Sequence, residues 1–121
     1  GMQYWSSNAN GGTKQILNMD VHKIMKSLIK KGRNEQALKV YNQYTGTHND
    51  YTNSLYIKGL SNLNRNDDIN EFIKKHNIND DNIGKYSIQF ITTLTDYYGK
   101  IGDIHRVNSI YNAINDDIKD A

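Results

Sequence analysis

The fold is decided by the stretch SLIKKGRNEQALKVYNQY at residues 27–44, because two later stretches repeat its pattern. They are GLSNLNRNDDINEFIKKH at 59–76 and YYGKIGDIHRVNSIYNAI at 97–114. In each stretch a small or β-branched residue follows a polar turn, and two large apolar residues stand three and four positions later. Equivalent positions are 32 and then 38 residues apart, a period typical of helix pairs that stack side by side.

The residues around these stretches also recur at helical spacing. Before the first turn, Leu28 stands four residues after Ile24 and three after Met25, a helical spacing. Glycines and polar breaks interrupt the pattern, and no stretch alternates apolar and polar residues for long enough to make a strand. We therefore expect six helices, which begin near Thr13, Asn34, Asn49 and Asp67, after Gly84, and near Asp103.

These patterns predict an all-α protein, a right-handed α-solenoid of about three helix-turn-helix repeats. We place the helical-repeat domain at residues 13–121, with approximate repeats at 18–49, 50–87 and 88–121. Residues 1–12 carry no periodicity and end in a pair of glycines, so we expect a disordered or loosely packed N-terminal lead.

Composition excludes several classes of protein. The chain has no cysteine, which excludes disulfides, zinc ribbons and thiol catalysis. It has no proline, so the strongest helix breaker is absent. No apolar run approaches the length of a membrane span, and we expect no membrane contact. The net charge of +2 is mildly basic, which is weaker than the charge of a strong nucleic-acid binder.

No catalytic or metal-binding motif can be assembled from the polar residues. The four histidines are dispersed, with no pair at the spacing of a zinc site. Three Asn-Asp-Asp triplets, at 66–68, 79–81 and 115–117, lack the spacing of a calcium loop. Two of them stand where a helix should begin, which favours capping. We expect no enzymatic activity, no metal and no cofactor.

Two parts of the chain resemble the pentatricopeptide repeat (PPR) family. They are LIKKGR at 28–33 with ALKVY at 37–41, and YGKIGD at 98–103 with Val107, Ile110 and Tyr111. The middle repeat departs from the pattern, because Asn64-Arg65 stands where a Gly-Arg or Gly-Asp pair belongs. Tetratricopeptide (TPR) repeats share the architecture, but usually have a terminal proline and an aromatic-Leu-Gly cluster, which are both absent here.

The resemblance implies a module that binds single-stranded RNA in the groove lined by the first helix of each repeat. Aligned on the turn, it places the base-reading role near the start of that helix on His22, Ser54 and Thr92, with Asn53 as the alternative if the register shifts by one. It places the base-reading role at the repeat end on Asn49, and backbone contacts on Lys30 and Lys100.

The same resemblance implies a role in organelle RNA processing or expression, with a mitochondrial location; otherwise we expect an intracellular protein. The alternative is a TPR-like scaffold whose groove accepts a peptide or a partner helix. An RNA binder should gather its lysines on one face, namely Lys23, Lys26, Lys30, Lys58 and Lys100. Repeat ends without capping repeats also favour a homodimer.

Overall fold

A computed structural model describes residues 18–120 of the chain. This part is all-helical and contains no strand, which confirms the predicted all-α class. The expected N-terminal lead at 1–12, and the expected helix start at Thr13, lie outside the described residues. The elements are α2 (Asn18–Lys30), α3 (Asn34–Gln43), α4 (Asp50–Asn62), α5 (Asn66–Lys75), the short 3-10 helix η1 (Ile83–Lys85), α6 (Ile88–Lys100) and α7 (Ile104–Asp120).

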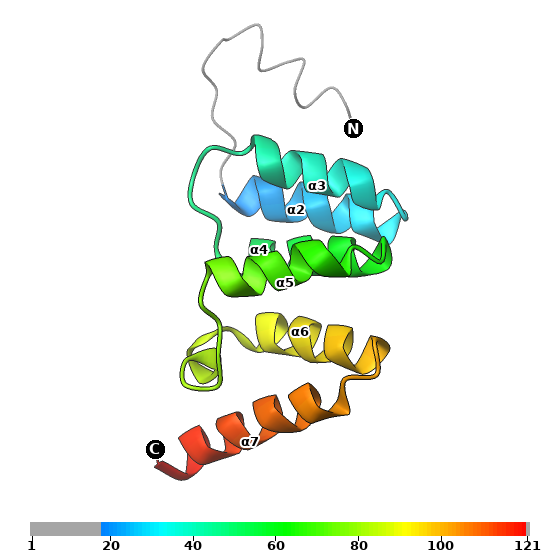
Figure 1. The fold of residues 1–121 in the computed structure, drawn as a ribbon. Coiled ribbons are helices and arrows are strands. Elements are labelled where there is room, and N and C mark those ends of the chain that lie inside the picture. Colours follow the sequence, from blue (N-terminus) through cyan, green and yellow to red (C-terminus); the bar gives the residue numbers. More distant parts are fainter. Residues whose placement is uncertain (1–17, 121) are drawn as a thin grey trace, which may run out of the picture.

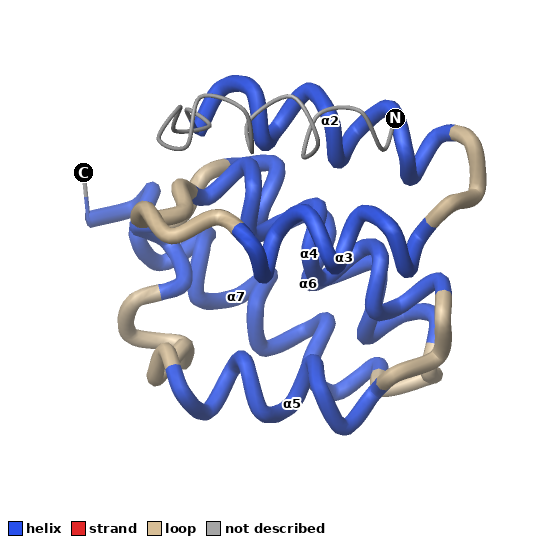
Figure 2. The backbone as a smooth tube through the Cα atoms, turned by 90° about the horizontal axis from the view of Figure 1, so that it is seen from above, coloured by secondary structure: helices blue, strands red, loops and turns tan. Residues whose placement is uncertain are grey.

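The helices pair into three antiparallel hairpins, α2–α3, α4–α5 and α6–α7 (Figure 1). Helices α2, α4 and α6 run in one direction, and the second helix of each hairpin runs back (Figure 1). Helix α4 contacts both α2 and α6, so these three helices lie next to one another in chain order. Seen from above, α4, α3 and α6 overlap near the centre, with α2 and α5 on opposite sides (Figure 2).

The three hairpin turns have the same geometry. Gly32 and Gly102 adopt left-handed φ values of 78° and 80°, and Asn64 adopts 58° at the equivalent position. In each turn a backbone N–H donates a hydrogen bond to the carbonyl five residues earlier. The pairs are Arg33 to Leu28, Arg65 to Leu60 and Asp103 to Tyr98. Asparagine is the residue after glycine that best tolerates this conformation, so the middle hairpin turns as the others do.

Two clusters of buried side chains form the core of the described residues. The larger joins α4, α5, η1, α6 and α7 and includes Ile57, Leu60, Ile69, Phe90, Leu94 and Tyr97. The smaller lies between α2 and α3 and consists of Val21, Met25, Ile29, Ala37 and Val40. Tyr56 of α4 packs against both clusters, and Leu38 of α3 belongs to the larger one. The first hairpin therefore has a core of its own, and both of its helices also pack against α4.

An aromatic stack contributes to the contact between α3 and α4. The ring of Tyr41 lies between His48 and Tyr56, with centroid separations of 3.7 Å and 4.0 Å. Its hydroxyl donates a 2.6 Å hydrogen bond to Asn53 Oδ1, and burial raises its pKa. His48 Nε2 lies 2.9 Å from the Tyr41 carbonyl. A carbonyl can only accept, so Nε2 carries the proton. His48 thus holds the loop between α3 and α4 against α3, and Tyr41 joins α3 to α4.

Stability should fall as the pH drops below about 6.5, the ordinary pKa of histidine. Burial lowers the pKa of His48, although its bond to Tyr41 opposes the effect, and burial also lowers the pKa of His22 and His76. Below 6.5 the unfolded chain therefore takes up more protons than the folded protein, and unfolding is favoured. Urea unfolding between roughly pH 7.5 and 5.5 measures this loss of unfolding free energy. Most carboxyl groups titrate below this range.

His48→Gln keeps a donor for the Tyr41 carbonyl but does not titrate, so it should make the pH dependence of the unfolding free energy shallower. An unchanged slope in this variant would contradict a neutral, stacked His48. The variant and the parent are compared by the slope of unfolding free energy against pH. The absolute free energy also changes, because the substitution removes a ring from the stack.

Candidate nucleic-acid interface

The first helices of the three hairpins are α2, α4 and α6. Most of their positive charge lies on the exposed sides of α2 and α4. Lys23, Lys26 and Lys30 are exposed along α2, three and four residues apart, so they form one stripe. Lys58 is exposed on α4 at the position equivalent to Lys26. Together with Tyr51, these side chains are called the basic face below. Because α2 and α4 are adjacent and run in the same direction, the stripes lie side by side.

Tyr51 gives the basic face an aromatic surface. It lies in the first turn of α4, and its side chain is 45% exposed. The ring of His22 on α2 meets it edge-on, with centroids 5.8 Å apart and planes at 84°. Burial and then the charge of nearby Lys26 lower the pKa of His22, so this ring is neutral at pH 7. Tyr51 and Lys58 are seven residues apart, which places them on the same side of α4.

Three of the expected site residues form side-chain hydrogen bonds within the protein. Ser54 is only 6% exposed, and its hydroxyl donates a 2.7 Å bond to the Tyr51 carbonyl. Asn53 is half-buried and accepts the hydrogen bond from Tyr41. Asn49 is exposed but caps α4, because its Oδ1 accepts from the Thr52 N–H at 2.9 Å and from the Thr52 hydroxyl at 2.6 Å. The predicted start of this helix is thereby confirmed.

The expected residues of α6 remain at the surface. Thr92 is exposed near the middle of that helix. Lys100 is exposed in its last turn, and its Nζ donates to the Ser61 carbonyl at the end of α4. Asp96 stands where α2 and α4 have Lys26 and Lys58. The positive charge is therefore concentrated over the first two hairpins, and α6 contributes mainly neutral polar groups.

Sequence reasoning missed Tyr51, although a signal for it was present. The alignment on the turns directed attention to Ser54, which lies three residues later and faces inward. Helical spacing puts Tyr51 on the same stripe as Leu55, Lys58 and Asn62. A tyrosine that shares a stripe with a lysine and an asparagine belongs to the polar side of its helix.

Residues 18–120 show neither a metal-binding group nor a membrane span. The described residues contain no group of three or more His, Cys, Asp or Glu that could hold a metal ion. None of the described helices is long and apolar enough to cross a membrane. At the C-terminal end, Tyr111 is 60% exposed, whereas the equivalent Tyr41 and Ile73 are half-buried. The expected self-association through an uncapped end stays a prediction.

Comparison with known proteins gives no relative for this chain: no family model, no curated protein and no solved structure matches it.

Proposed function

We propose that the protein is a single-stranded RNA-binding helical-repeat module of the PPR type, which acts in organelle RNA metabolism. The observation that carries the proposal is the exposed Tyr51 ring, which His22 supports and the lysines of α2 and α4 flank. In this proposal the three hairpins are successive repeats of a right-handed solenoid, and α2, α4 and α6 line its binding face. The equal turns at Gly32, Asn64 and Gly102 support that assignment.

The chemistry of the basic face suits a flexible, unpaired strand. Lysines that neutralise phosphates release counterions, which gives affinity without sequence preference. An exposed aromatic ring stacks on any unpaired base, whereas bases inside a duplex offer no free face. Thr92 on α6 adds a neutral hydroxyl for a base edge. Asn49, Asn53 and Ser54 support the position of Tyr51 through their contacts with α3 and with the first turn of α4.

The decisive experiment compares two triple variants by fluorescence polarisation with a short, labelled single-stranded RNA of random sequence. Lys23, Lys26 and Lys58 are replaced by alanine in the test variant. Lys39, Lys74 and Lys75, which are exposed on α3 and α5, are replaced in the control. Both variants lose the same charge, so only the location differs. The test variant should bind more weakly, and its slope of log affinity against log salt should fall by about 2, as expected for three lost contacts to single-stranded phosphates.

A Tyr51→Ala variant completes the test. Loss of one stacked base should cost about 1–3 kcal/mol of binding free energy. The ratio of the affinities for single-stranded and duplex RNA should therefore become smaller. Equal weakening in both triple variants would mean non-specific attraction to net charge and would refute the basic face. Absence of binding at low salt would refute RNA binding and direct attention to a protein partner.

A further inference from the structure

One exposed position on the first helices of the hairpins changes its charge in the third repeat. Counted back from the left-handed residue of each hairpin turn, the sixth position is Lys26 in α2, Lys58 in α4 and Asp96 in α6. All three side chains are exposed. Helix α4 packs against both α2 and α6, and the three helices run in the same direction (Figure 1). These side chains therefore form a row across the helices, with two positive charges followed by a negative one.

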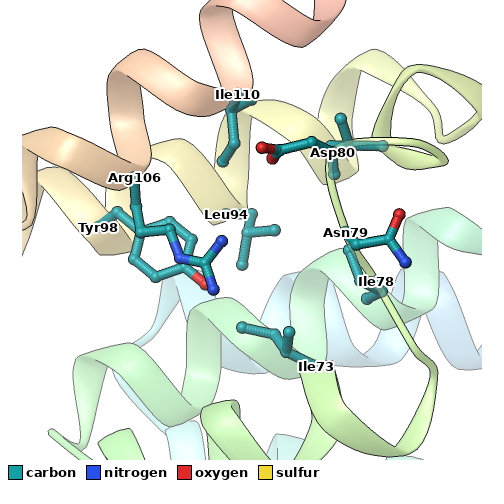
Figure 3. Close-up of a pocket in the computed structure, with 9 residues that line it drawn as sticks. Ile73, Ile78, Asn79, Asp80, Leu94, Tyr98, Arg106 and Ile110 are labelled. Carbon is teal, nitrogen blue, oxygen red and sulfur yellow. The ribbon is translucent and has the colours of Figure 1, made fainter.

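The carboxylate of Asp96 lies on the outer side of α6. Leu94 and Tyr98, two residues before and after it, are buried and line the small hollow beside α7 (Figure 3). A step of two residues turns an α-helix by about 200°, so Asp96 faces away from that hollow. Among the described residues Asp96 forms no ion pair, and Lys100, one turn later, donates to the Ser61 carbonyl instead. The negative charge is therefore presented to solvent at the edge of the basic face.

A strand that follows this row meets a phosphate-binding lysine on two helices and a repelling carboxylate on the third. Packed helices lie about 8–10 Å apart, which is comparable with the Debye length of about 8 Å at physiological ionic strength. Screening therefore leaves part of the repulsion between Asp96 and a phosphate that follows the one at Lys58. The remaining lysines of the basic face are Lys23, Lys26 and Lys30, so one-to-one pairing accounts for at most four phosphates.

We propose that Asp96 limits the bound RNA to a short single strand over the first two hairpins, whose phosphates do not continue across α6. This inference rests on the proposed RNA-binding function and adds the length of strand that the basic face takes. Four paired phosphates correspond to about four to six nucleotides, at the short end of the site sizes of single-strand binders. Thr92, one turn before Asp96, is uncharged and still available to the last base. The substrate class is thus an RNA loop or strand end and not a long unpaired tract.

The test reverses the charge at Asp96 and follows binding to a labelled single-stranded RNA of random sequence, about 12 nucleotides long, by fluorescence polarisation. Asp96→Lys continues the row of lysines, so one more phosphate is paired and the slope of log affinity against log salt should steepen by about 0.7. The ratio of the affinities at about 50 mM and 200 mM salt should therefore rise about threefold. Asp96→Asn removes the repulsion without adding a contact, so it should raise affinity at low salt and keep the slope. Glu71→Lys, an equal charge change at an exposed position on α5, is the matched control and should also keep the slope.

Chemical-shift mapping of the whole chain by ¹H–¹⁵N NMR gives a second readout. The same RNA should shift amide signals of α2 and α4 in the parent and leave residues 95–100 unchanged, whereas in Asp96→Lys those residues should shift as well. An unchanged slope in Asp96→Lys, equal steepening in Glu71→Lys, or shifts of residues 95–100 in the parent would overturn the inference and leave RNA binding intact. Absence of binding by the parent at low salt would refute the proposed function and this inference with it. Circular dichroism checks that each variant keeps the helix content of the parent.

Discussion

Phe90→Ala should lower the free energy of unfolding by about 3–5 kcal/mol, the usual cost of removing a buried aromatic side chain. Phe90 is almost completely buried in α6, where its ring stacks on Tyr86 at 4.8 Å and approaches Phe72 at 6.4 Å. The substitution therefore leaves a cavity where α5, α6 and the end of η1 meet. Domains of this kind are stable by only about 5–15 kcal/mol, so a large part of the population should unfold on mild heating.

Ile88→Ala is the matched control for this prediction. Ile88 lies two residues earlier in the same helix but is 74% exposed, so its loss should change stability by no more than about 0.5 kcal/mol. Urea unfolding followed by far-ultraviolet circular dichroism gives both values. Similar losses for the two variants would mean that the larger core cluster is not organised around α6.

Met25→Ala should also cost about 2–5 kcal/mol, but its effect should be confined to the first hairpin. Met25 is fully buried in the smaller cluster, which involves only α2 and α3 with partly buried neighbours from α4. Proteins open in cooperative units that follow such clusters. Amide hydrogen exchange should therefore become faster in α2 and α3, while α6 keeps the protection of the parent protein.

Ser27→Ala provides the control, because Ser27 is exposed on the same helix and its replacement should leave exchange unchanged. Equal loss of protection in α2 and α6 after the Met25 substitution would show that the described helices form one cooperative unit. Loss of protection in α2 and α3 but not in α4 would identify the stack of Tyr41 and Tyr56 as the boundary between the two cooperative units.

Local signals were sufficient to predict the helices. Gly32 and Gly102 marked two turns correctly, and Asn49 marked the start of α4. The substitution at Asn64 made the middle repeat look irregular, although asparagine takes up the same left-handed conformation as glycine. The fold class could therefore be predicted because each hairpin depends on contacts that are close in sequence.

Features that depend on packing between hairpins could not be predicted. Ser54 is polar, and its burial depends on how α2 and α6 pack against α4, while the Tyr51 carbonyl of the same helix accepts from its hydroxyl. The contact between η1 and α7 depends on where the chain folds back after α5, and it joins residues that are distant in the sequence. Sequence spacing within one helix carries no information about such a meeting.

The division of the core into two clusters has a mechanical consequence. If the chain were stretched from its two ends in an optical trap, tension would reach both clusters at once, and the smaller one should yield first. Extension should then proceed in two steps, with α2 and α3 released at lower force and the remaining helices at higher force. The stacked rings of Tyr41 and Tyr56 join α3 to α4 and should resist the first step. The Tyr41→Ala substitution should therefore lower the force of the first step alone.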